Sequence, residues 1–187
     1  MTAAALMGEL AAIVGAEHLL PGDTPPYGED CSRDRVGFHA SADAVVLPAD
    51  ADEVRRVVAW CYRHEIPVVP RGGGTGLAGG AVPVTGGVVV AMERLTAVRS
   101  FDAPLWRAEV EAGLSTANVT RLARENGLLF PPNPGAAEQS QIGGTRAGDI
   151  GLQETEARAS LAALRRAVAT ARPTTSTPVT VHPWRAQ

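Results

Sequence analysis

The residues that point most directly to chemistry form a glycine-rich segment, PRGGGTGLAGGAVP, at positions 70–83. Six of the nine residues from Gly72 to Gly80 are glycine. Glycine loses much conformational entropy on folding, so this density is expected only where the backbone turns sharply or closely approaches another group. Consecutive N–H groups without intervening side chains can converge on an anion, most often phosphate. The alternative is a flexible linker, and the lack of serine and the flanking apolar runs argue against it.

Three kinds of phosphate-binding loop are candidates for this segment. A Walker loop requires a Lys-Ser or Lys-Thr pair after its last glycine, and the segment contains none. The dinucleotide pattern G-x-G-x-x-G occurs at 74–79, but residues 80–87 (GAVPVTGG) cannot form the helix that this motif opens. Glu93 lies near the spacing of a ribose-binding acid, yet without that helix it carries no assignment. The sequence favours the third kind, which wraps the anion with backbone amides alone.

Residues 70–80, PRGGGTGLAGG, resemble the FAD-pyrophosphate loop of the vanillyl-alcohol oxidase / p-cresol methylhydroxylase superfamily. Within it they are most similar to the branch that contains glycolate oxidase and D-lactate dehydrogenase. A second segment supports the same resemblance: PPNPG at 131–135 and QSQIGG at 139–144 are similar to the stretch that passes the flavin ring and ribityl chain. Alone, this segment would be interpreted as an ordinary Pro/Gly turn. Two motifs in family order make a chance match a poor explanation.

The resemblance implies an α/β (α+β) fold, namely an incomplete two-subdomain FAD-binding domain of the p-cresol methylhydroxylase type. The loop amides would satisfy the pyrophosphate, and the second segment would line the ribityl chain and the ring. The cofactor-binding residues so implied are Pro70, Arg71, Gly72, Gly73, Gly74, Thr75, Gly76, Leu77, Gly79, Gly80, Pro132, Gly135, Ser140, Gln141, Ile142, Gly143 and Gly144. A side chain at Gly74 would block the approach of the ligand. Arg71 would either add positive charge or be a structural ion-pair partner, and Thr75 stands where covalent relatives carry a flavin-linked histidine, which implies non-covalent FAD.

The implied activity is that of an FAD-dependent oxidoreductase acting on the CH–OH group of a small 2-hydroxy acid, of the glycolate or D-lactate type. Hydride would pass to FAD and electrons to an unknown acceptor. The substrate-binding arginines and histidines of the family lie in a later part without a counterpart here, so we assign no catalytic residue. Two alternatives remain open: an FAD- or ADP-binding module without turnover, and a non-functional remnant. A yellow dye-reducing protein would indicate the enzyme, a yellow inert one the module, and a colourless aggregate the remnant.

Composition argues against several other functions. With 187 residues, a formal net charge of −3 and a pI near 5.8, the chain has no electrostatic reason to bind nucleic acid or an anionic membrane. No apolar run approaches the roughly twenty residues of a membrane span, and the N-terminus lacks the basic region of a signal peptide. Cys31, Cys61 and the four scattered histidines show no metal-ligand spacing. We therefore expect a cytoplasmic protein without a metal site.

The N-terminal residues predict a helix followed by a connection. Residues 3–20 carry leucine, isoleucine and valine on one helical face and predict an amphipathic first helix. Residues 21–42 are rich in Pro, Gly, Asp and Ser. Tyr27, Asp30 and Ser32 in this connection are similar to residues at the same place in the related enzymes, although a solvated loop is the alternative.

The next residues predict the sheet that holds the glycine loop. Residues 43–47 predict a short buried strand, and Asp50 with Glu53 predicts a capping box at the start of a helix. A strand at 68–69 then leads into the loop, and another follows at 87–91. The strand–helix–strand unit predicts parallel pairing with a right-handed crossover.

The second half predicts two strands, at 97–101 and 107–112, and a helix from Ser115 to about Glu125 that Gly127 ends. Beyond residue 144 the family pattern stops. Residues 152–171 predict a helix, and TTSTP at 174–178 predicts disorder. We expect a truncated or frame-shifted family member with four parts: an N-terminal helix and loop (1–42), a first FAD-binding subdomain (43–95), the start of a second (96–145) and a divergent tail (146–187).

Overall fold

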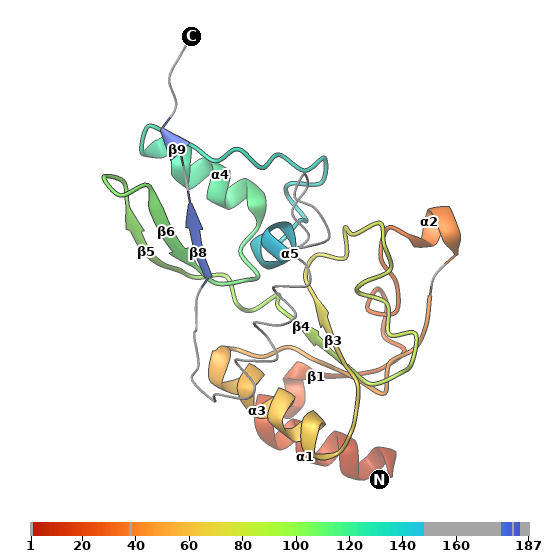
Figure 1. The fold of residues 1–187 in the computed structure, drawn as a ribbon. Coiled ribbons are helices and arrows are strands. Elements are labelled where there is room, and N and C mark those ends of the chain that lie inside the picture. The colour runs from red at the N-terminus through yellow and green to blue at the C-terminus, as the bar shows by residue number, and fades with distance from the viewer. Residues whose placement is uncertain (1, 38, 148–176, 181, 184–187) are drawn as a thin grey trace.

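The computed structural model describes residues 2–37, 39–147, 177–180 and 182–183. Its first part is a four-stranded sheet in the order β1-β2-β4-β3. The strands are β1 (Leu19–Pro21), β2 (Ala44–Val46), β3 (Val68–Arg71) and β4 (Val88–Ala91). β2, β4 and β3 are parallel, whereas β1 is antiparallel to β2. The predicted strand–helix–strand unit is therefore parallel, but β4 lies between β2 and β3, so the two predicted strands are not direct neighbours (Figure 1).

Both faces of this sheet are covered. Helices α1 (Ala3–Val14) and α3 (Ala51–Arg63) lie on one face (Figure 1). The core on that side consists of Leu6, Leu10, Val14, Val57, Trp60 and Cys61 from the helices, with Ala44, Val46, Val88 and Val90 from the strands. The alternate strand residues Val45, Val89 and Ala91 form a second cluster with Tyr27, from the connection after β1. Burial on both faces explains why β2 and β4 are continuously apolar.

The first helix is shorter than the sequence predicts. α1 ends at Val14, Gly15 follows with φ +87°, and Ala16–His18 form a short 3-10 turn, η1. Leu19 pairs with Val46 in the sheet instead of continuing the helix. The expectation of one helix over 3–20 is therefore wrong for its last six residues, because glycine reverses the chain and the two leucines pair with the sheet.

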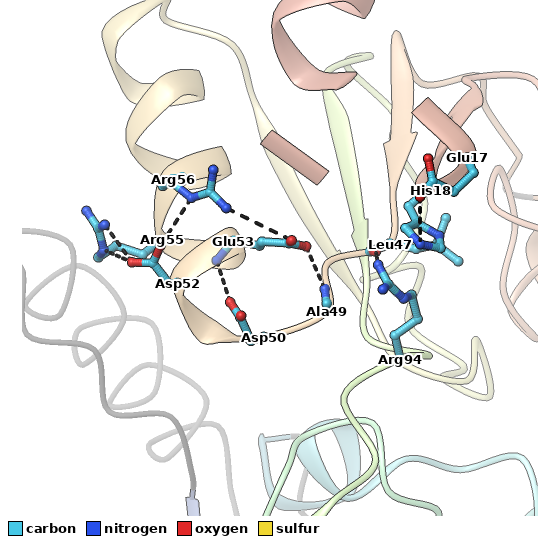
Figure 2. A network of polar contacts seen from close by, with 10 residues as sticks. All are labelled: Glu17, His18, Leu47, Ala49, Asp50, Asp52, Glu53, Arg55, Arg56 and Arg94. Carbon is cyan, nitrogen blue, oxygen red and sulfur yellow. Dashed lines mark hydrogen bonds and ion pairs between the residues drawn. The ribbon is translucent and has the colours of Figure 1, made fainter. Parts of the chain in front are cut away.

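The predicted N-cap at Asp50 is confirmed at the start of α3, but Glu53 accepts from the N–H of Ala49, one residue before the cap, and not from that of Asp50 as a capping box requires (Figure 2). Asp50 Oδ1 accepts a hydrogen bond from the Glu53 N–H at 2.8 Å, and Glu53 Oε2 accepts one from the Ala49 N–H at 2.7 Å. In the first turn of the helix, Asp52 forms ion pairs with Arg55 and Arg56. These acidic groups lie at the positive end of the helix dipole, and the Asp50 carboxylate satisfies one free N–H group of the first turn.

The second part is built around an antiparallel sheet in the order β5-β6-β8. The elements here are β5 (Val98–Asp102), β6 (Arg107–Val110), α4 (Thr116–Glu125), β7 (Leu128–Leu129), α5 (Ile142–Ala147), β8 (Thr177–Thr180) and β9 (His182–Pro183). β9 pairs with β7. The remaining helix, α2 (Arg33–Val36), belongs to the connection after β1 in the first part. The helix predicted from Ser115 to about Glu125 is confirmed as α4. The Ser115 side chain accepts from the Asn118 N–H at 3.2 Å, and Gly127 follows the end of the helix with φ +70°. Its apolar face packs with β6, β7 and α5 in a separate cluster that includes Val110, Val119, Phe130 and Ile142.

The C-terminal residues differ from the sequence prediction. Composition predicts disorder over 174–178, but Thr177 and Pro178 belong to β8, which extends the second sheet along β6. Backbone pairing with the open edge of β6 outweighs the composition of the segment, which alone favours disorder. The helix expected at 152–171 lies outside the described residues. Among the residues that the structure describes, no helix is long and apolar enough to cross a membrane.

Candidate functional site

The glycine loop leaves the carboxyl end of β3, where ligands commonly bind to parallel sheets. β3 is an edge strand, so Pro70, which has no N–H, removes no bond from the interior of the sheet. From Gly72 through Ala81, no backbone N–H donates a hydrogen bond to any part of the chain that the structure describes. The loop therefore presents a row of free donors, the arrangement that favours an anion.

The second motif, which comprises residues 131–135 and 139–144, contacts this loop through residues 139–141. A Cβ on Gly73 would come within 1.8 Å of the Gln139 carbonyl oxygen, and a Cβ on Gly72 would lie 3.5 Å from the Gln141 side chain. The absence of a side chain at Gly73 thus allows two segments far apart in sequence to touch. The structure thus brings residues 139–141 of the second motif against the glycine loop.

Backbone hydrogen bonds hold the second motif in place. The Thr116 N–H donates to the Ser140 carbonyl at 2.8 Å, and the Ile142 and Gly143 N–H groups donate to Leu114 and Ala112 at 2.8 and 2.9 Å. The Ser140, Thr145 and Thr116 hydroxyls form a buried chain with spacings of 2.8 Å. Ile142 is part of the hydrophobic core. The side chains of Ser140 and Ile142 therefore have contacts within the protein that support the motif.

Other predicted site residues have no such contacts. A Cβ at Gly80, Gly135 or Gly144 would meet nothing within 4 Å. Leu77 is exposed, and Pro132 is half-buried. Packing among the described residues does not require glycine at these three positions, so a role for them depends on what binds there.

Beneath the loop lies a layer of buried polar residues. Arg71 is 4% exposed, and its Nη1 donates to the carbonyl oxygen of Glu29. Its guanidinium lies over the ring of Tyr27, 5.6 Å from the centroid. The Tyr27 hydroxyl in turn donates to Glu93 Oε1 at 2.9 Å. The Cys31 N–H donates to the Gly74 carbonyl at 3.1 Å, which ties the connection after β1 to the loop itself.

Burial changes the ionisation of two groups in this layer. Desolvation, reinforced by the hydrogen bond to Glu93, raises the pKa of Tyr27 to about 12. Desolvation also lowers the pKa of the Arg71 guanidinium, while the negative charges of Asp30, Glu93 and Glu29 oppose that effect. No ion pair links Arg71 to a carboxylate within the described part of the chain. A buried cation therefore lies next to a row of free N–H groups.

Three buried oxygen atoms around the loop have no hydrogen-bond partner among the described residues. They are Asp30 Oδ2, Ser32 Oγ and Gln141 Oε1. Asp30 Oδ2 lies 3.7 Å from the position of a Cβ on Gly76, and Gln141 Oε1 lies 3.5 Å from that of a Cβ on Gly72. Buried polar atoms are almost always satisfied, so these oxygens fit a ligand with hydroxyl donors. The free amides fit phosphate acceptors on the same ligand.

Tyr27, Asp30 and Ser32 belong to this buried layer and the exposed Glu93 borders it, although the sequence alone gives none of them a binding role. The family similarity of the first three is an available signal, but a Pro/Gly-rich connection has no periodicity that distinguishes a buried segment from a solvated one. Glu93 closely follows β4, and a polar residue just after a buried parallel strand is a signal that could identify it.

Known proteins resemble this chain in sequence and in fold. The family described as FAD binding domain matches residues 42–172, so the similarity extends beyond residue 144, where we expected it to stop. The glycolate oxidase subunit GlcD of Bacillus subtilis is 36% identical over 107 residues, which are 57% of this chain and 23% of that protein. The D-2-hydroxyglutarate dehydrogenase of Xanthomonas citri pv. viticola is 37% identical over 131 residues, 70% of this chain and 27% of that protein. The chain thus spans about a quarter of the length of these curated relatives.

Solved structures show the same fold. Alkyldihydroxyacetonephosphate synthase matches with a TM-score of 0.65 and 25% identity, over 79% of this chain and 32% of that one. p-Cresol methylhydroxylase matches with a TM-score of 0.66 and 19% identity, over 77% and 29%. The expected fold, a partial FAD-binding domain of the p-cresol methylhydroxylase type, is confirmed. The family match covers most of the chain, and the chain belongs to the FAD binding domain family.

Proposed function

We propose that the glycine loop and the second motif bind FAD together, non-covalently. The observation that carries this proposal is the row of free amides from Gly72 through Ala81, packed against residues 139–141. The amides of residues 72–76 and 79–80 would donate to the pyrophosphate oxygens. Gln141 Oε1 and Asp30 Oδ2 would accept from hydroxyl groups of the ligand, because both are buried acceptors without a partner in the described residues.

We propose further that this site serves an oxidoreductase acting on a small 2-hydroxy acid. The names of the relatives support that substrate class, since they include a glycolate oxidase subunit, a D-2-hydroxyglutarate dehydrogenase and D-lactate dehydrogenases. When bound, FAD would supply the acceptor for a hydride from the substrate carbon. The residues of this chain would hold and orient the cofactor, and we assign none of them a catalytic role. The acceptor that reoxidises the flavin is left unassigned.

Purified protein mixed with FAD and then desalted tests the binding proposal. We expect the two visible absorption bands of oxidised flavin to remain with the protein. Acid precipitation should release all flavin into the supernatant, because Thr75 cannot form the covalent bond that a histidine makes. Loss of the bands from folded protein would contradict FAD binding by this chain. Flavin pelleting with the protein would contradict the non-covalent mode.

Dye reduction separates turnover from binding alone. With glycolate, D-lactate or D-2-hydroxyglutarate as donor, the FAD-loaded protein should reduce an artificial acceptor if this chain performs the reaction. Retention of flavin without dye reduction would restrict this chain to FAD binding.

The proposed subdomains are residues 43–95 and 96–145, and the change of sheet and of hydrophobic cluster between β4 and β5 supports the boundary between them. The first sheet and its core also include β1 and α1 from the N-terminal residues, and the second sheet includes β8 from the C-terminal ones. The cytoplasmic location expected from the sequence stays a prediction, which immunoblotting of fractionated cells would test.

A further inference from the structure

Arg71 is a buried cation without a carboxylate partner in the described part of the chain. It is 4% exposed, and its one hydrogen bond there goes to the carbonyl oxygen of Glu29. Burying a charge is costly unless it is paired. The free amides that begin at Gly72 lie on the loop that this residue opens. Arg71 therefore adds to a site that already favours an anion a positive charge that forms no direct ion pair among the described residues and that Asp30, Glu93 and Glu29 offset only from a distance.

The guanidinium also occupies the space next to Gly74. A Cβ on Gly74 would lie 2.2 Å from Arg71 Nη2 and 2.8 Å from Cζ, far inside van der Waals contact. Gly74 has φ +68°, and its carbonyl accepts from the Cys31 N–H. The turn at Gly74 is thus held by two contacts within the protein, one with Arg71 and one with the connection after β1. A side chain at this position would collide with Arg71, whether or not a ligand is bound.

We propose that Arg71 is a positioning residue of the glycine loop. Its buried guanidinium fixes the turn at Gly74 from beneath and places a positive charge behind the amides that face a diphosphate. Glycine at 74 is therefore favoured by two features, its φ of +68° and the space that the Arg71 guanidinium occupies. The charge part of this proposal rests on the proposed FAD binding, whereas the contact between Arg71 and Gly74 does not.

A double-mutant cycle without ligand tests the contact. Gly74→Ala is made in the wild type and in Arg71→Ala, and the urea midpoint is measured for each protein. Gly127→Ala is the matched control, because Gly127 has φ +70° but open space around its Cβ position. In the wild type, we expect Gly74→Ala to lower the midpoint more than Gly127→Ala does. In the Arg71→Ala background, the two glycine substitutions should lower the midpoint by similar amounts.

If Gly74→Ala lowers the urea midpoint equally in the wild type and in Arg71→Ala, the proposed contact between Arg71 and Gly74 is overturned. If Arg71→Ala does not fold, Arg71→Met replaces it in the cycle, since methionine fills part of the same space without the planar group.

Binding of FAD to Arg71→Lys and Arg71→Met tests the charge. Both variants lose the guanidinium, but only lysine keeps a positive charge. We expect Arg71→Lys to bind FAD at least tenfold more tightly than Arg71→Met, measured at equal ionic strength on folded protein. Equal affinities would overturn the role of the charge.

The two proposals fail in different ways. If the wild type binds no FAD, the proposed function and the role of the charge both fail, and the ligand-free cycle still decides the contact. If the wild type binds FAD and the cycle shows no coupling, FAD binding stands and the contact fails.

Discussion

The hydroxyl of Tyr27 shows how the layer beneath the loop changes the chemistry of a single residue. Its folded pKa is about 12, against an ordinary value of 10.0. A raised pKa means that the folded state binds the proton more tightly than the unfolded state, so the resulting stabilisation is present below pH 10 and is lost as pH rises toward 12. Burial likewise raises the pKa of the Cys61 thiol to about 11, so part of the loss of stability in alkali belongs to that group.

Tyr27→Phe should therefore reduce the fall in the free energy of unfolding between pH 10 and pH 12. Urea denaturation at several alkaline pH values measures this fall. The chain contains no lysine, so no lysine ammonium group titrates in the same range. Tyr62→Phe is the control, because Tyr62 is 76% exposed and lies outside this layer. An equal fall in wild type and Tyr27→Phe would contradict the effect of burial on Tyr27.

At the scale of elements, the start of α3 gives a prediction about stability. Asp50→Ala removes the side chain that accepts from the Glu53 N–H and should lower the free energy of unfolding by about 1 kcal/mol. Asp50→Asn keeps a capping oxygen and should cost much less. Urea unfolding of both variants measures the difference, and equal destabilisation by alanine and asparagine would contradict a capping role.

The elements also show which parts of the fold can be predicted from sequence. The helix cap at Asp50 and the start of α4 at Ser115 depend on residues three positions apart, so local patterns suffice to find them. The end of α1 and the place of β4 depend on distant partners. Leu19 continues an apolar helical pattern but pairs with Val46, and nothing near Val88 indicates that its strand separates β2 from β3.

The same distinction applies to the site. The glycine loop and residues 139–144 are recognisable because both have unusual compositions that match a family. The buried Tyr27 and Asp30 belong to a connection whose composition is typical of a solvated loop. They are buried because that connection covers the second face of the sheet, which follows from the tertiary structure alone.

At the scale of the whole molecule, stability depends on the packing of α1 and α3 on the first sheet. Leu10 is fully buried in this core, and Leu10→Ala should cost about 2–5 kcal/mol through lost transfer energy and a residual cavity. Leu105→Ala is the matched control, because Leu105 is 70% exposed and its truncation should change stability by less than about 0.5 kcal/mol. Urea unfolding measures both costs, and similar values for the two variants would contradict this assignment of the core.

The candidate site is also a property of the whole molecule, because one motif follows the first sheet and the other leads into α5. Gly73 is the point of contact between the two motifs, and a Cβ there would come within 1.8 Å of the Gln139 carbonyl oxygen. Gly73→Ala should therefore push the motifs apart and weaken the binding of a ligand that needs both. Gly8→Ala is the control, since Gly8 lies in α1 with nothing within 4 Å of its Cβ position.

An FAD site formed by both motifs is best tested by an equilibrium titration of FAD into wild type, Gly73→Ala and Gly8→Ala, followed by flavin fluorescence. We expect saturable binding to the wild type and to Gly8→Ala, and at least tenfold weaker binding to Gly73→Ala while circular dichroism shows that the variant is folded. Absence of binding to the wild type, or equal binding by all three proteins, would contradict the claim that the glycine loop and the second motif together form an FAD site.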